Sequence, residues 1–130
     1  MEINNNNSDN NSNRYEEDHM PSWTPLLLLF PPVLPFFYNY KVIYENNTLT
    51  FGYSTSLSSR TINKEDISEL EECEIHGFTQ WGGWGIRGHV NTVGYIAENG
   101  LGIKFLDNKT GTRYTFSCKD PKKLIEVMYS

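Results

Sequence analysis

Five side chains of this sequence belong to types that ligate zinc or act in nucleophilic catalysis: Cys73, Glu74, His76, His89 and Cys118. Strong zinc sites take their ligands in two short pairs, whereas Cys73-x-x-His76 occurs once and has no matching second pair. A nucleophilic Cys73 needs a lowered pKa, and the acidic residues on either side of it act in the opposite direction. The sequence also contains no Gly-x-Ser-x-Gly motif. We therefore expect no metal, no cofactor and no enzymatic activity.

A glycine-rich stretch, Gly83-Trp-Gly85-Ile-Arg-Gly88, formally matches the dinucleotide-binding motif Gly-x-Gly-x-x-Gly. That motif requires a helix that begins inside it, but residues 89–93 are rich in β-branched side chains and lack a helical period. A kinase phosphate loop is also excluded, because the 26 residues after Lys104 are too few for the catalytic and metal-binding motifs. We expect these glycines to let a strand bend, with Trp84 packed against it.

An apolar segment, residues 23–39, is interrupted by four prolines and has no charge from residue 25 to residue 38. A membrane-spanning helix needs about 20 apolar residues, so a span is disfavoured. Exposed apolar stretches mark interfaces, and residues 25–38 are therefore the predicted docking surface. Its candidate binding residues, with Trp81 and Trp84 as neighbours, are Leu27, Leu28, Phe30, Phe36 and Phe37.

The net charge of −5 argues against a nucleic-acid partner. The basic residues gather near the C-terminus as Lys119, Lys122 and Lys123, with Arg113. The predicted first hairpin loop, Asn46-Asn47, has only Lys41 nearby, so we expect no specific phosphoinositide binding. Attraction of the lysines to an anionic lipid surface is the alternative to a protein partner, at about 1 kcal/mol per basic residue.

The N-terminus is Asn-rich and then acidic, and has too few apolar residues to form a core. We expect residues 1–22 to be a disordered tail and residues 40–130 to be one domain. The N-terminus lacks the pattern of a secretory signal, which favours a cytoplasmic location with reduced cysteines. Membrane association through residues 25–38 stays open, as do the partner's identity and the oligomeric state.

Beyond residue 40 the sequence has the alternating pattern of short strands. Asn46-Asn47 and Asn99-Gly100 are predicted hairpin turns, the second between residues 94–97 and 101–106. Residues 67–75 fit a strand better than a helix, because strands flank them. At the end, Asp120 as N-cap, Pro121, and an apolar face of Leu124, Ile125 and Met128 predict a helix. The expected fold is mainly β, with about seven antiparallel strands and one C-terminal helix.

That order, together with Gly82-Gly83-Trp84-Gly85-Ile86-Arg87 and Asp120-Pro121-Lys122-Lys123-Leu124, resembles bacterial-type PH-like domains of unknown function that carry a Gly-Gly-Trp-Gly-Ile-Arg signature. The similarity covers about residues 40–130. It implies a small antiparallel barrel that the terminal helix closes at one end.

Our main functional expectation is a non-catalytic interaction or scaffold domain that docks through the apolar segment. The alternative is a peripheral membrane module that uses this segment together with the three C-terminal lysines. A third, weaker hypothesis is a small-ligand carrier or enzyme with its site near Arg87 and His89.

Overall fold

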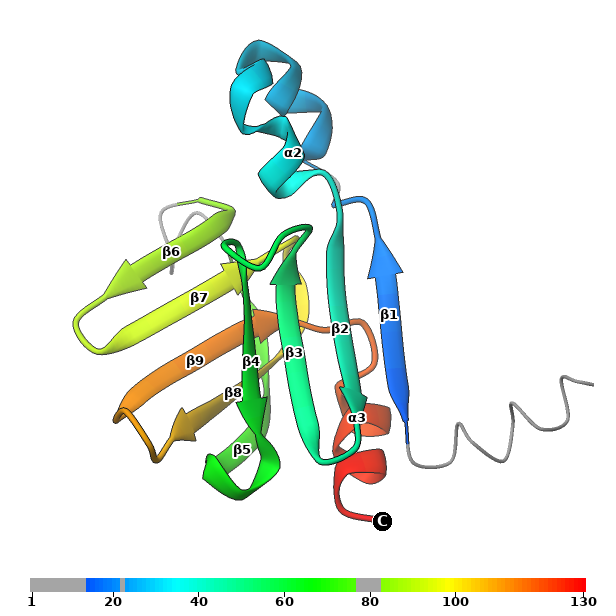
Figure 1. Cartoon of the computed structure of the whole chain (residues 1–130), viewed down its shortest axis with the longest axis vertical. Helices are drawn as coiled ribbons and strands as arrows, with labels where there is room; N and C mark the ends of the chain where they lie inside the picture. The colour runs from blue at the N-terminus through cyan, green and yellow to red at the C-terminus, as the bar shows by residue number, and fades with distance from the viewer. Residues whose placement is uncertain (1–13, 22, 77–82) are drawn as a thin grey trace, which may run out of the picture.

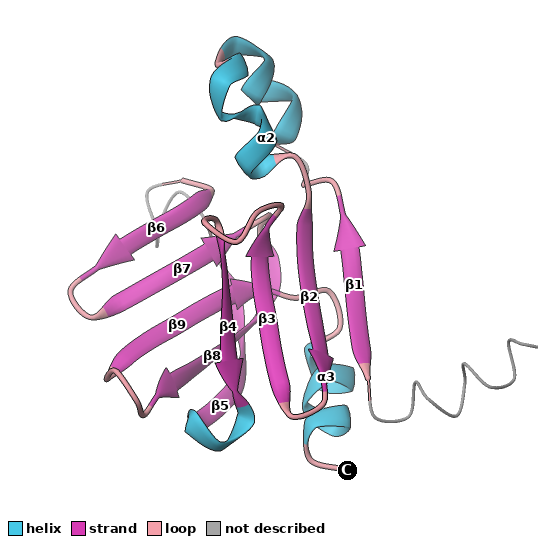
Figure 2. Cartoon of the chain, in the orientation of Figure 1, coloured by secondary structure: helices cyan, strands magenta, loops and turns pink. Residues whose placement is uncertain are grey.

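The computed structural model of the chain describes residues 14–21, 23–76 and 83–130, and these residues form two β-sheets and a C-terminal helix (Figures 1 and 2). The predicted mainly-β class with a helix at the C-terminus is therefore confirmed. The described residues contain nine strands, two more than the sequence suggested.

The first sheet is an antiparallel meander of four strands in sequence order: β1 (Tyr15–His19), β2 (Tyr40–Glu45), β3 (Thr48–Tyr53) and β4 (Ser59–Asn63). Asn46 and Asn47 connect β2 to β3 with φ of 52° and 62°. Two consecutive positive φ values match the right-handed twist of a hairpin, so the predicted turn is confirmed.

Strand β1 corrects the expectation of a disordered tail over residues 1–22. Its residues alternate between the core side and solvent, with Tyr15 buried and Glu16 and Asp18 exposed. The inward positions after Tyr15 are the polar residues Glu17 and His19, so the sequence shows no apolar alternation. Hydrogen bonds replace apolar contacts on this strand, as described below. The earlier part of the predicted tail, residues 1–13, lies outside the described residues.

The apolar segment connects β1 to β2 and projects from one end of the molecule (Figure 1). It forms three short helical pieces: η1 (Thr24–Leu29), η2 (Pro31–Val33) and α2 (Leu34–Phe37). Prolines at the start of η2 have no N–H to satisfy, which suits the first positions of a helical turn. The segment returns directly beside its starting point, because His19 pairs with Tyr40 in the sheet.

The second sheet begins after a short helical turn, η3 (Lys64–Asp66), and has the order β5-β8-β9-β7-β6. Its strands are β5 (Ile67–Ile75), β6 (Gly85–His89), β7 (Thr92–Ile96), β8 (Gly100–Asp107) and β9 (Thr112–Ser117). The predicted strand over residues 67–75 is therefore confirmed. It is an edge strand, and its four glutamates discourage pairing with another chain.

Two predictions about strand pairing are wrong in this sheet. The first is that all strands are antiparallel, because β7 and β9 pair in parallel, with Thr92 opposite Arg113 and Tyr95 opposite Phe116. The second is that Asn99-Gly100 closes a hairpin, because β9 lies between the two strands that this turn connects. An Asn-Gly pair fixes the local reversal of the chain, but the packing of the complete sheet decides which strands become neighbours.

The core lies between the two sheets and is largely aromatic. Phe51 of β3 stacks on Phe116 of β9, with ring centroids 4.5 Å apart, and meets the rings of Tyr95, Phe105 and Tyr114 edge-on. These contacts join the first sheet to three strands of the second. Hydrogen bonding gives two separate sheets rather than one closed barrel.

The C-terminal helix α3 (Pro121–Met128) packs against β1, β5 and β8. The side chain of Asp120 accepts a hydrogen bond from the backbone N–H of Lys123, which confirms the predicted N-cap. Leu124, Val127 and Met128 are buried, whereas the predicted Ile125 is only half-buried. Among the described helices, none has the length and apolar character needed to cross a lipid bilayer.

Candidate functional site

The apolar segment exposes large hydrophobic side chains at the end of the molecule. Leu29 is 73% exposed, Phe30 65% and Leu26 57%. Phe36 and Tyr38 are also exposed, as is Leu57 in the turn between β3 and β4. Soluble proteins rarely cluster such side chains at the surface unless a partner covers them. The predicted docking residues Phe30 and Phe36 are therefore accessible.

The base of the segment is fixed to the body of the protein by Trp23. Its indole packs against Phe37 and Tyr53, with ring centroids 5.7 and 5.9 Å apart, and its Nε1 donates to the hydroxyl of Tyr53 at 3.3 Å. Tyr53 in turn donates to the carbonyl of Ile96 in the second sheet. Burial raises the pKa of Tyr53, which keeps its hydroxyl protonated and able to donate.

A second attachment comes from the turn between β3 and β4, where the Ser58 hydroxyl donates to the carbonyl of Phe36 at 2.8 Å. Phe37 points to the other side and packs against the core, with its ring 4.9 Å from that of Tyr53. Phe37 is therefore an anchor rather than part of the accessible surface. The backbones of Leu27 and Leu28 lie in η1, but their side chains lie outside what the structure describes.

Of the aromatic neighbours predicted for this surface, Trp81 lies outside the described residues. Trp84 is partly buried and packs against Ile75 and Ile96 of the second sheet. Gly83 and Gly85 adopt φ of 144° and 93°, so the glycines do bend the chain with Trp84 packed beside them. The indole of Trp23 also meets this bend, because its Cζ2 lies 3.8 Å from the position of a Cβ on Gly85.

Arg87, the residue of the third hypothesis, is exposed on β6, and its Cζ lies 3.7 Å from the position that a Cβ on Gly83 would take. Its proposed partner His89 ends the same strand, but the structure does not describe the His89 side chain. The residues of the docking hypothesis and those of this hypothesis lie on different elements.

Two of the three C-terminal lysines are engaged in ion pairs. Lys122 pairs with Glu72 at 2.8 Å, which raises the pKa of Lys122, and Lys123 pairs with Glu126 at 3.7 Å. Lys119 follows β9 and donates its backbone N–H to Glu17. Figure 1 shows α3 far from the apolar segment along the longest axis of the molecule. The structure therefore does not bring the predicted basic and apolar residues together.

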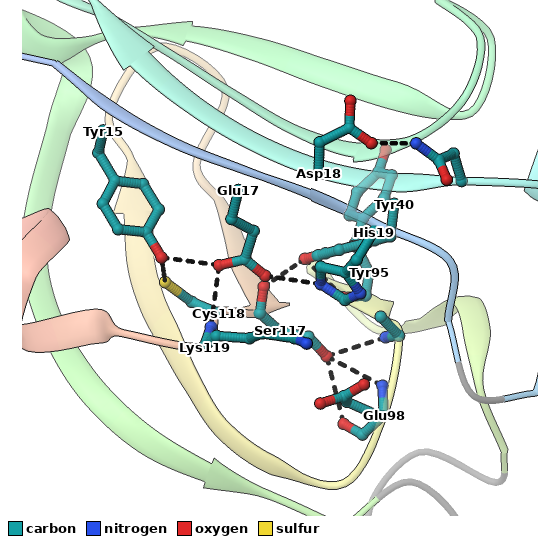
Figure 3. A network of polar contacts seen from close by, with 12 residues as sticks. Tyr15, Glu17, Asp18, His19, Tyr40, Tyr95, Glu98, Ser117, Cys118 and Lys119 are labelled. Atoms are coloured by element: carbon teal, nitrogen blue, oxygen red, sulfur yellow. Dashed lines mark hydrogen bonds and ion pairs between the residues drawn. The ribbon is translucent and has the colours of Figure 1, made fainter. Parts of the chain in front are cut away.

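A polar network that the sequence analysis missed lies between β1 and the end of β9 (Figure 3). The Glu17 side chain, only 8% exposed, accepts hydrogen bonds from the Tyr15 hydroxyl at 2.7 Å and from the backbone N–H of Lys119 at 2.9 Å. Its other oxygen lies 2.9 Å from Nε2 of His19. Three partners thus hold this buried carboxylate in place.

Cys118 completes the network, with its Sγ 3.6 Å from the Tyr15 hydroxyl. Burial, with a smaller contribution from the Glu17 charge, raises the pKa of this thiol to about 12. The thiol is therefore neutral at physiological pH and is not an activated nucleophile. No group of three His, Cys, Asp or Glu in the described ranges could hold a metal ion.

The sequence contains one signal for this network, the run Tyr15-Glu-Glu-Asp-His19. Tyr15, Glu17 and His19 alternate along it, so they lie on one face of a strand and can form hydrogen bonds with one another. The acidic run predicts solvent exposure instead, because carboxylates are usually solvated. Comparison with known proteins adds no constraint: no family model matches the chain, and no similar protein was found among curated proteins or among solved structures.

Proposed function

We propose that this chain is a non-catalytic interaction domain that docks a protein partner through the apolar segment. The observation that carries the proposal is the exposure of Leu26, Leu29 and Phe30 on a segment that Trp23 and Ser58 hold in place. Because the base is fixed, a partner meets an ordered surface and pays less to order it on binding.

The exposed side chains can supply a useful binding energy. Full burial of one fully exposed Leu or Phe side chain is worth about 1.5–3 kcal/mol. Because Leu26, Phe30 and Leu29 are 57%, 65% and 73% exposed, together they provide about 3–6 kcal/mol. Association costs about 4–15 kcal/mol in lost freedom of motion. The tip alone therefore supports a weak complex, and tighter binding needs further contacts around it.

The membrane alternative draws support from the same uncharged residues and from Tyr38, an amphipathic side chain that is 52% exposed at the return of the segment to β2. The anionic-lipid contribution is weaker, because Glu72 and Glu126 already neutralise Lys122 and Lys123. We therefore place a protein partner first.

The proposal does not depend on kinship with PH-like domains. The resemblance of residues 82–87 to that signature implies an antiparallel barrel, whereas the second sheet has a parallel pair. The exposed segment would suit an interaction domain whether or not the chain is related to PH-like domains.

Site-specific photo-crosslinking tests the proposal. A photoreactive residue at position 30 should capture a discrete protein in the cells that make the chain, and Leu29→Ser with Phe36→Ser should abolish the product. The same probe at Val90, another highly exposed apolar residue, is the matched control. Equal products from both positions, or none from position 30, would contradict the proposal.

Flotation with vesicles separates the membrane alternative. The intact chain should not float with phosphatidylcholine vesicles or with vesicles that also contain phosphatidylserine. Flotation that Leu29→Ser abolishes would transfer the function to a lipid surface.

A further inference from the structure

A pocket of about 340 Å³ lies beside the polar network, outside the apolar segment. Three parts of the chain line it: Glu17 and His19 of β1, residues 98–101 at the start of β8, and residues 117–119 at the end of β9. Figure 3 shows these parts converging around Ser117 and Cys118. Pockets that hold small ligands have volumes of about 300–1,000 Å³.

Hydrogen bonds tie the three walls to one another. The Ser117 hydroxyl accepts from the backbone N–H of Ala97 at 2.8 Å, and the Ser117 carbonyl accepts from the Tyr40 hydroxyl at 2.5 Å. The backbone N–H of Cys118 donates to Leu101, and that of Lys119 to Glu17. The pocket is therefore formed before any ligand arrives, which lowers the cost of binding.

The lining favours a positive charge. The lining includes two carboxylate residues, Glu17 and Glu98, and one lysine, Lys119. It also includes His19, whose Nε2 lies 2.9 Å from Glu17. Glu17 is largely withdrawn from water, where its attraction for a cation is screened less than at the surface. The neutral thiol of Cys118 adds no charge.

The lining also decides which cation fits. The described residues contain no group of three side chains that could hold a metal ion, so the two carboxylates of the lining do not form part of such a group. A volume of about 340 Å³ has room for a polyatomic group, and Leu101 offers an apolar wall to an alkyl chain. These properties match a guanidinium or primary ammonium group on an aliphatic stem, as in an arginine or lysine side chain.

We propose that this pocket binds a guanidinium or alkylammonium group, supplied by a side chain of a bound protein or by a free small molecule. The pocket shares no lining residue with the apolar segment. The proposal therefore stands or falls independently of the docking function.

The test is NMR titration of the full chain with butylguanidinium and with its uncharged analogue butylurea. Butylguanidinium should give saturable shifts centred on residues 98–101 and 117–119, and butylurea should give none there. Equal shifts with both compounds, or no saturable shift with butylguanidinium, would overturn the proposal.

Glu98→Gln should weaken butylguanidinium binding about tenfold, because it removes a charged acceptor and keeps the side-chain shape. Glu126→Gln removes the same charge from the surface of α3 and should leave the affinity unchanged. Equal effects of the two variants would mean general charge attraction and would overturn the site.

The source of the cation is resolved by a third compound, the peptide Gly-Gly-Arg-Gly-Gly. Binding at least as tight as that of butylguanidinium supports a side chain of a partner protein. Binding of butylguanidinium but not of the peptide supports a free small molecule. Either result retains the pocket as a cation site.

Discussion

Glu17 shows how a buried carboxylate can stabilise an edge strand. It joins β1 to the end of β9 through the Lys119 backbone and fixes Tyr15 and His19 on its own strand. For a solvent-exposed carboxylate, the loss of these hydrogen bonds would cost little, because water would replace them. The Glu17 side chain is only 8% exposed, so water does not replace a hydrogen bond that it loses.

Glu17→Gln should lower the free energy of unfolding by about 2–3 kcal/mol, because it removes the charge that strengthens the hydrogen bonds from Tyr15 and Lys119 and replaces the oxygen beside His19 with an NH₂ group. Urea unfolding followed by circular dichroism measures the loss.

The matched control is Glu16→Gln on the adjacent, exposed position, where the ion pair with Arg14 is at the surface. Its effect should stay below about 1 kcal/mol. Similar losses for the two variants would show that Glu17 acts only through its charge and not through its hydrogen bonds.

Among the elements, strand β3 requires a glycine where it pairs with the start of β4, for lack of space. Gly52 has φ of 127°, and a Cβ there would lie 2.6 Å from Cα of Ser59. Gly100, at the start of β8, has a nearly identical φ of 128° with open space around it. An alanine would therefore meet the same unfavourable φ at both positions, but would clash with neighbouring atoms only at position 52.

Gly52→Ala should therefore destabilise the protein by at least about 2 kcal/mol more than Gly100→Ala, because overpacking adds to the strain that both variants share. Thermal unfolding of the two variants measures the difference. Equal melting temperatures would show that the β3–β4 turn moves aside at little cost.

The elements also show what the sequence could reveal. Alternation identified the strands from residue 40 onward, and the cap at Asp120 identified α3, because both signals are local. Strand β1 escaped notice because its inward positions are polar. The order of the second sheet could not be read either, since the position of β9 depends on contacts among strands far apart in sequence.

The candidate site divides in the same way. The uncharged, proline-rich composition of residues 25–38 indicated an exposed apolar surface, and Leu26, Leu29 and Phe30 are exposed there. The anchor role of Trp23 and the pocket beside Glu17 depend on tertiary contacts, which no spacing in the sequence records.

The whole molecule has a pH dependence that follows from its buried hydroxyl and thiol groups. Burial raises the pKa of Tyr15, Tyr40 and Tyr53 above the usual value for tyrosine, and raises that of Cys118 to about 12. The folded protein keeps these protons at a pH where the unfolded chain releases them. Stability is therefore complete below about pH 9 and declines as the pH rises beyond it.

Urea midpoints at neutral pH and at about pH 10.5 should show this decline. Cys118→Ala removes one of the shifted groups and should make the decline shallower, even if its stability at neutral pH is lower. A midpoint that is constant up to about pH 11, or an unchanged slope in the variant, would contradict the assignment of these buried groups.

The position of β9 has a consequence for synthesis. It is the last of the described strands, yet it lies in the middle of its sheet, with β8 on one side and β7 on the other. A ribosome therefore synthesises the flanking β6–β7 and β5–β8 pairs before strand β9, which joins them. During that interval the β5–β8 pair and the β6–β7 pair each have an unpaired strand edge. A premature stop codon after residue 111 would leave these two pairs without the strand that joins them, and the unpaired edges would be exposed to the quality-control machinery.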